Sequence, residues 1–322
     1  MLKTVVTGGA GFLGANLVRH LLKLGREVRA TDNISRGSIK NLDGLPIEKV
    51  HADLRDYNQA LQTVADSDCV YHLAARVGSI EYLHGGKKAE LEALQSNLAI
   101  DTNVFRACNE CGVKKIVYAS SVSVYPIDLQ QKASATFSES DVSPVNPEGG
   151  YGWAKLIGEI QLDLTENCRS GIARIFNAYG EFSEFGRTAQ VIPALIRKAV
   201  RYPDEEFVVW GDGTQSRDFL YVKDCVEALL KLEDKASYPP LKVNVGHPDT
   251  VSIRELAELV VQVSGKSIEI KFDPSKPAGP RSRIPDVRKA RRELNWEPTT
   301  SLREGLERTY RWIEDSLSVG SR

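Results

Sequence analysis

The sequence has almost no surplus of charge of either sign. Its 42 Lys and Arg residues are balanced by 43 Asp and Glu residues, which gives a formal net charge of -1. Proteins that bind nucleic acids or membrane surfaces usually carry a broad basic field. The composition therefore predicts neither nucleic acid nor a membrane as a partner.

Long apolar runs are also missing from the sequence. No stretch approaches the roughly 20 apolar residues that a transmembrane helix needs. The segment before Gly8 is too short for a signal peptide, because a glycine turn begins there. We therefore expect a cytoplasmic enzyme.

Cysteine is scarce, and its five residues are an odd number that argues against a disulfide framework. Cys108 and Cys111 have the Cys-x-x-Cys spacing, but no second pair is present to complete a zinc site. We expect buried free thiols and no metal site.

What the sequence does have is a regular alternation of short β-rich runs and helical stretches in its first half. Strands are predicted at residues 2–7, 27–31, 48–51, 69–73, 114–119 and 172–176, and helices at 12–24, 97–111 and 151–168. This order is typical of an α/β fold with a Rossmann-type, doubly wound parallel sheet.

The rhythm changes after Asn177, where longer irregular stretches are rich in Gly, Pro, Asp and Arg. Residues 241–245 can return to the sheet as an extra strand, so the two lobes are expected to interleave. The predicted division is residues 1–176 with about 222–246 for the Rossmann domain, and 177–221 with 247–322 for a smaller C-terminal lobe.

A glycine motif follows the first predicted strand and opens the first helix. Gly8, Gly11 and Gly14 have the Gly-x-x-Gly-x-x-Gly spacing that permits a tight turn and brings a pyrophosphate to the helix N-terminus. Asp32 ends the second strand, where a carboxylate can accept hydrogen bonds from the adenosine ribose and repel a 2′-phosphate. The pattern predicts NAD rather than NADP, although Arg36 lies close by in the sequence.

Two further segments lie along the expected cofactor path. Asp53, after the third strand, can receive the adenine amino group, and Leu73, Ala74 and Ala75 end the fourth strand. A solvated acid or an ordinary packing residue remains an alternative for each of them.

Tyr151 and Lys155 are four residues apart at the start of a predicted helix, so their side chains project from one face. A neighbouring ammonium favours the phenolate, which makes a tyrosine usable as a base. Lys155 can also hold the nicotinamide ribose. Ser121 and Ser123, at the end of the fifth strand, can bring a hydroxyl to the same substrate atom.

Together these residues resemble the extended short-chain dehydrogenase/reductase family, in its group of NAD-dependent epimerases and dehydratases that act on nucleotide-sugars. The resemblance runs nearly end to end. It includes the glycine motif, Tyr-x-x-x-Lys, RIFNAYG at 174–180, GDG-x-x-x-RDF-x-YV-x-D at 211–224 and GPR at 279–281.

The resemblance implies roles for further residues of this chain. It places Phe12, Leu13, Leu54 and Asn97 on the cofactor, and Val77, Gly78, Ser79, Asn177, Val191, Arg217 and Arg281 on the nucleotide-sugar. Arg217 and Arg281 are expected on the diphosphate, for which a guanidinium has suitable bidentate geometry. The family also implies a homodimer.

Segments 74–80, 125–126 and 207–213 are similar to GDP-mannose 3,5-epimerases and GDP-fucose synthases. Those enzymes carry a cysteine where this chain has Ser123, and the synthase a histidine where it has Gln190. The 4,6-dehydratases have an Asp-Glu pair in place of Val122 and Ser123. Because Ser and Gln titrate too weakly to replace these acids and bases, C4 epimerisation through a transient 4-keto-sugar is the predicted reaction.

Three alternatives remain open. A 4-dehydrogenase or 4-ketoreductase would use the same residues and release its cofactor at each turnover. A 3,5-epimerase could use other groups, such as His84 or Lys87. A non-catalytic dinucleotide-binding protein is disfavoured by the joint presence of Ser121, Tyr151 and Lys155.

Overall fold

The computed structural model describes residues 2–132, 135–186, 188–276, 279, 281 and 283–319. Its centre is a seven-stranded sheet with the order β12-β7-β5-β4-β1-β2-β3, in which every neighbouring pair is parallel. The strands are β1 (Lys3–Thr7), β2 (Glu27–Asp32), β3 (Glu48–His51), β4 (Cys69–His72), β5 (Lys115–Ser121), β7 (Arg169–Ile175) and β12 (Leu241–Val245). The predicted α/β fold class is confirmed.

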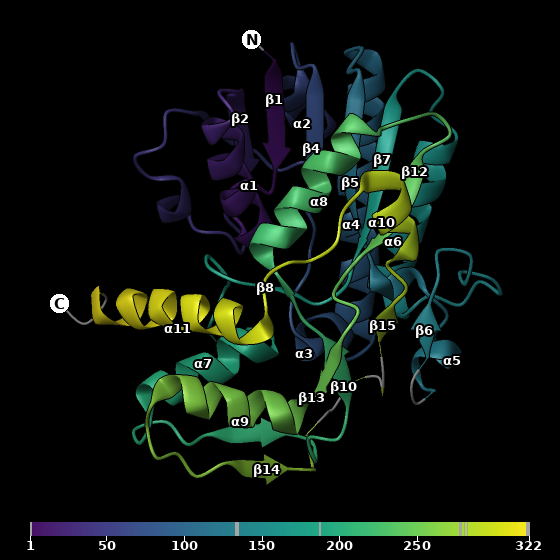
Figure 1. Cartoon of the computed structure of the whole chain (residues 1–322). Coiled ribbons are helices and arrows are strands. Elements are labelled where there is room, and N and C mark those ends of the chain that lie inside the picture. The colour runs from purple at the N-terminus through teal and green to yellow at the C-terminus, as the bar shows by residue number, and fades with distance from the viewer. Residues whose placement is uncertain are drawn as a thin grey trace.

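Helices cover both faces of this sheet (Figure 1). α1 (Phe12–Lys23) and α8 (Val222–Asp234) pack together on one face, and α2 (Tyr57–Val64), α4 (Lys87–Glu110) and α6 (Gly149–Asp163) on the other. The first face buries Leu17 and Leu229, and the second buries Val104 and Leu162. A parallel sheet needs such cover on both sides, because its strands are apolar on both faces.

A smaller lobe lies below the carboxyl ends of the strands in Figure 1. It contains the helices α7 (Val191–Arg201), α9 (Ile253–Ser264) and α11 (Leu302–Val319), and the strand pairs β9 (Val208–Trp210) with β14 (Lys271–Asp273) and β10 (Ser216–Asp218) with β13 (Thr250–Ser252). The local sequence sets the ends of α9: Ser252 and Glu255 form a capping box, and Gly265 ends the helix in the left-handed conformation, at φ 65°.

The remaining elements are short. They are η1 (Ile39–Leu42), α3 (Ile80–His84), η2 (Val122–Val124), α5 (Ile127–Gln130), β6 (Thr136–Phe137), β8 (Ala178–Tyr179), β11 (Leu220–Tyr221), β15 (Ile284–Pro285) and α10 (Arg288–Leu294).

Two predicted helix boundaries are wrong. α4 begins at Lys87, ten residues before the predicted start at Asn97, and α6 ends at Asp163 rather than at Cys168. The second difference has a tertiary cause, because Arg169 already pairs with Lys115 in the sheet and the chain must leave the helix to reach it. The predicted return of 241–245 to the sheet is confirmed by its pairing with β7.

All five cysteines are free thiols, and burial raises the pKa of Cys108 well above its usual value. None of the helices described in the structure combines the length and apolarity required to cross a bilayer.

Candidate active site

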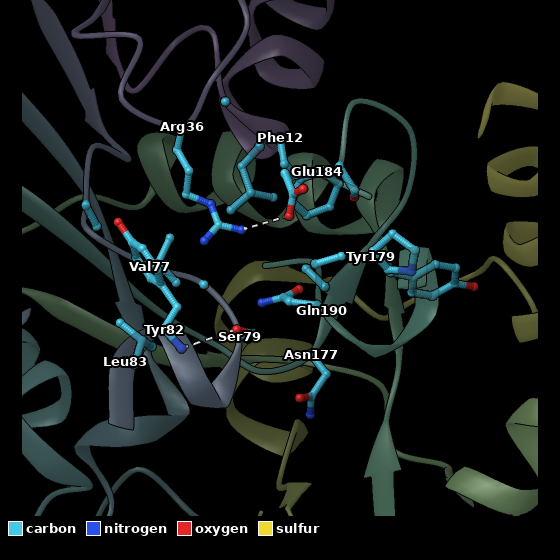
Figure 2. Close-up of a pocket in the computed structure, with 18 of the residues that line it drawn as sticks. Phe12, Arg36, Val77, Ser79, Tyr82, Leu83, Asn177, Tyr179, Glu184 and Gln190 are labelled. Atoms are coloured by element: carbon cyan, nitrogen blue, oxygen red, sulfur yellow. Dashed lines mark hydrogen bonds and ion pairs between the residues drawn. The ribbon is translucent and has the colours of Figure 1, made fainter. Parts of the chain in front are cut away.

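A cleft of about 1540 Å³ opens at the carboxyl ends of the central strands. Parallel sheets bind ligands at this edge, beside the point where the strand order reverses, which here lies between β1 and β4. Side chains from the sheet side and from the smaller lobe face one another across it, as Figure 2 shows for Val77, Asn177 and Gln190. The volume exceeds the roughly 300–1,000 Å³ of a typical single-ligand pocket.

The glycine turn forms one end of the cleft. Gly8 has φ +67°, and a Cβ on it would lie 2.9 Å from the backbone nitrogen of Ala74. A Cβ on Gly14 would lie 2.1 Å from the carbonyl oxygen of Gly8. α1 then begins at Phe12 without a side-chain cap and without an acidic residue in its first turn. Its free N–H groups and positive dipole end suit an anion.

Asp32 holds this turn in place. Its carboxylate accepts a hydrogen bond from Ala10 N at 3.1 Å and another from Ile34 N at 2.8 Å. Burial raises the pKa of Asp32, and these two bonds oppose that rise. Asp53 also lines the cleft, where its ion pair with Arg55 holds the pKa of the carboxyl below its usual value.

Arg36 reaches across the cleft from the loop after β2. Its Nη2 donates to the carbonyl oxygen of Thr188 at 3.1 Å and lies 3.4 Å from Glu184 Oε2, as the dashed line in Figure 2 marks. The guanidinium lies 5.2 Å from the ring centroid of Tyr82. Its Nη1 is buried without a hydrogen-bond partner in the part of the chain described.

Ser121, Tyr151 and Lys155 all line the same cleft. Ser121 ends β5, and the other two lie in the first two turns of α6. Burial raises the pKa of Tyr151 far above its usual value, and the Ser121 hydroxyl opposes this rise. Burial also lowers the pKa of Lys155, whose Nζ has no hydrogen-bond partner among the described residues. Without a ligand, Tyr151 is therefore a phenol.

A partly buried ion pair that the sequence did not reveal lies next to Tyr151. Glu148 Oε2 accepts a hydrogen bond from Ser123 Oγ at 3.0 Å and pairs with Arg283. Burial opposes ionisation of Glu148, but Arg283 brings its pKa below the usual value. The carboxylate lies three residues before Tyr151, and all four side chains line the cleft.

Arg217 lies at the lobe side of the cleft and is 8% exposed. Its Nη1 donates to the carbonyl oxygen of its neighbour Ser216 at 2.7 Å. Burial and the nearby Arg283 lower its pKa to about 10. A buried guanidinium with this environment is an attractive partner for an anion.

Asn177 lines the cleft, and its amide is held by the fully buried carboxyl of Asp218. Its Nδ2 donates to Asp218 Oδ1 at 2.5 Å, and burial raises the pKa of Asp218 to about 7.

The other predicted site residues divide into two groups. Those that line the cleft are Gly11, Phe12, Leu13, Leu54, Leu73, Ala74, Ala75, Val77, Gly78, Ser79 and Val191. Asn97 and Arg281 are not among the residues that line it. The amide of Asn97 is used in hydrogen bonds to Arg76 and Ala93, and Arg281 is exposed. His84 lines the cleft and contacts Glu90 at 2.6 Å, whereas Lys87 is exposed.

Similar proteins of known activity are found along the whole chain. GDP-mannose 3,5-epimerase 1 of Oryza sativa subsp. indica is 30% identical over 98% of this chain and 82% of its own length. The UDP-glucose 4-epimerase of Thermotoga maritima, solved with UDP-glucose, has a TM-score of 0.88 at 26% identity and covers 98% of this chain and 100% of its own.

A second solved structure is that of UDP-glucuronic acid 4-epimerase from Bacillus cereus, in complex with UDP-glucuronic acid and NAD. It has a TM-score of 0.85 at 29% identity and covers 98% of this chain and 100% of its own. The sequence model of the NAD dependent epimerase/dehydratase family matches residues 4–246. The family resemblance inferred from the motifs is thereby confirmed, and the chain belongs to the NAD-dependent epimerase/dehydratase family.

Proposed function

We propose that the chain is an NAD-dependent epimerase that inverts C4 of the sugar in a nucleotide-sugar, through a transient 4-keto-sugar. The observation that carries this proposal is the convergence of Ser121, Tyr151 and Lys155 in one cleft with the glycine turn. Relatives with the same fold include two 4-epimerases of UDP-sugars.

The residues present fit NAD. The glycine turn has no room for side chains at Gly8 and Gly14, and the uncapped N-terminus of α1 suits a pyrophosphate. Asp32 suits the adenosine ribose. The buried Lys155 ammonium, which has no hydrogen-bond partner among the residues the structure describes, suits the nicotinamide ribose. When bound at these residues, NAD would supply the acceptor for the C4 hydride and the donor that returns it.

In the proposed mechanism Tyr151 removes the proton of the C4 hydroxyl and afterwards returns it, while Ser121 holds the same oxygen. Tyr151 starts as a phenol, so it first releases its own proton to solvent, and the proposed role of the Lys155 ammonium is to favour the resulting phenolate when ligands displace water from the cleft. A charge acts more strongly there, because the effective dielectric constant falls. Rotation of the keto-sugar between the two hydride transfers inverts C4.

Arg217 is proposed as the ligand of the substrate diphosphate, and Asn177 as a hydrogen-bonding partner of the sugar side. Arg217 is buried, cationic and on the lobe side of the cleft. Arg281 remains a prediction, since its side chain is exposed and is not among the residues that line the cleft.

One observation favours a second candidate, proton exchange at the carbon next to the ketone. Glu148, hydrogen bonded to Ser123, provides a carboxylate at a position where serine alone was judged too weak. The 30% identical relative is named a 3,5-epimerase. Proton exchange by Glu148 would give this chain such an activity.

We further propose a homodimer. α6 exposes Trp153 and Ile160, Leu164 directly after its end is also exposed, and the neighbouring α4 exposes Leu91. An apolar face shared by two adjacent helices suits a symmetric interface. Analytical ultracentrifugation of the purified chain tests this proposal, and a monomer at all concentrations would contradict it.

The test of function is incubation of the NAD-loaded protein with UDP-, GDP-, CDP- and dTDP-sugars in deuterium oxide. Product stereochemistry, deuterium content and NADH absorbance are followed together. C4 inversion without net NADH and without deuterium supports the 4-epimerase. Stoichiometric NADH formation or use indicates an oxidoreductase, and deuterium at C3 or C5 indicates proton exchange.

A further inference from the structure

Lys155 lies against a carboxylate that the mechanism above does not use. Asp101 comes from the middle of α4, is fully buried, and has its Oδ1 3.9 Å from Lys155 Nζ. Lys155 also lies 4.5 Å from the ring centroid of Tyr118, on β5. Glu159, one turn further along α6, is held by Arg174 at 2.7 Å and by Ser120 Oγ at 2.5 Å. Asp101 is thus the nearest ion-pairing group that the structure describes for Lys155.

The hydrogen bonds around Asp101 define its charge. Leu73 N and Ala74 N both donate to Thr7 Oγ1 at 3.1 Å. The Thr7 hydroxyl hydrogen is then free to donate to His72 Nδ1, which lies 2.7 Å away. A ring nitrogen that accepts is unprotonated, so the proton of the neutral imidazole is on Nε2.

His72 Nε2 therefore donates to Asp101 Oδ1 at 3.0 Å, and Tyr118 Oη donates to Oδ2 at 2.5 Å. Two donors and a nearby ammonium favour the ionised carboxylate. Burial alone would raise the pKa of Asp101, but Lys155, His72 and Tyr118 together bring it below the usual value. Burial lowers the pKa of His72, in agreement with a neutral ring.

We propose that Asp101 is a positioning residue whose carboxylate charge keeps Lys155 protonated in the buried site. This inference rests on the proposed function, because it assigns Asp101 to the same Tyr151 and Lys155 pair. Burial works against the charge of Lys155, and the Asp101 carboxylate opposes that effect. Without Asp101 the amine would lose its proton at a lower pH and would no longer favour the Tyr151 phenolate.

The inference predicts the direction of a pH shift. An opposite charge within about 4–6 Å typically moves a pKa by roughly one to three pH units. In the NAD-loaded Asp101→Asn protein, the alkaline limb of kcat/KM against pH should move to lower pH by at least about one unit. The pH at which NAD affinity falls, measured by calorimetry, should move in the same direction, because Lys155 is the proposed ribose ligand.

Tyr118→Phe is the matched control. It removes a neutral donor from the same carboxylate and disturbs the same buried cluster, but keeps the charge of Asp101 and the ring beside Lys155. Its alkaline limb should stay in place. Asp101→Glu, which restores the charge, should return the limb toward that of the parent protein.

The experiments distinguish a failure of the Asp101 inference from a failure of the proposed function. An unmoved alkaline limb and an unmoved NAD transition in Asp101→Asn would overturn the inference, as would an equal shift in Tyr118→Phe. If no nucleotide-sugar is turned over by the parent protein, the proposed function fails, while the NAD titration still tests Asp101. If Asp101→Asn does not fold, Asp101→Ser, which also lacks the charge and leaves room for water, is tested with the same expectation.

Discussion

Replacing Arg217 by methionine should stabilise the protein and weaken its substrate binding at the same time. Burial and Arg283 lower the pKa of Arg217 from the usual arginine value to about 10. At about 1.4 kcal/mol for each unit of pKa, the buried charge destabilises the ligand-free protein by about 3 kcal/mol. The hydrogen bond to Ser216 offsets about 1 kcal/mol of this. The unfolding free energy of Arg217→Met should therefore rise by about 2 kcal/mol.

The pH dependence has a definite sign. The folded pKa of Arg217 is lower than the unfolded one, so its charge is destabilising at every pH below about 10. The penalty disappears as pH rises between about 10 and 12.5. Urea denaturation at neutral pH lies fully inside the unfavourable range, so the gain in Arg217→Met should be complete there.

Binding should change in the opposite direction. A hydrogen bond from a charged group contributes about 1.5–3 kcal/mol, so affinity for a nucleoside diphosphate should fall roughly 10- to 100-fold. Calorimetry with UDP, GDP and NAD measures this, and NAD affinity should be unchanged. Arg292→Met, at an exposed position next to Glu293, is the control that should alter neither property. Lower stability with unchanged nucleotide affinity, or equal loss of NAD, would refute the reasoning.

Three further outcomes are expected. Tyr151→Phe should lower turnover by about 10²- to 10⁴-fold. The amount of bound NAD, measured after extraction, should stay stoichiometric. Near-normal activity would exclude Tyr151 as the base. Gly14→Ala should lose NAD in the same extraction assay, because its Cβ would lie 2.1 Å from the carbonyl oxygen of Gly8; full retention would show that the turn relaxes. Glu148→Gln should keep C4 inversion but lose any deuterium uptake next to the ketone; uptake at the parent rate would exclude Glu148, leaving Ser123 to be examined.

The sheet was predictable because its signals are local. Each of the first six strands is a short β-rich run bounded by turn residues, and the glycine motif fixes the order of the first strand and helix. The end of α6 could not be predicted from the sequence, because the residues after Asp163 continue a helical sequence pattern. The chain leaves that pattern to pair Arg169 with Lys115, a contact that only the folded sheet creates.

The candidate site divides in the same way. The sequence identifies Ser121, Tyr151 and Lys155 by their spacing and by their positions at the end of a predicted strand or the start of a predicted helix. Glu148 and Arg283 are 135 residues apart, and neither lies in a recognisable motif. The only sequence feature that could have identified Glu148 as a site residue was its position three residues before Tyr151. Its partner could be found only in three dimensions.

The same limit applies to Asp101. In the sequence it is one of several acids in a helix of mixed composition, and for such a residue an exposed position is the usual expectation. Its contacts with His72 and Lys155 join α4, β4 and α6. Full burial of an acid is the feature that distinguishes it, and burial depends on the packing of these elements.

The two hydrogen bonds that Asp32 accepts have a consequence for engineering the coenzyme preference. One bond comes from Ala10 in the glycine turn and the other from Ile34 in the loop that follows β2. A substitution that removes the carboxylate to admit a 2′-phosphate would also remove both hydrogen bonds, which connect the glycine turn to that loop. A single substitution at position 32 is therefore not enough to change the coenzyme preference to NADP. It must supply a new acceptor for the Ala10 amide before a basic residue can be useful there.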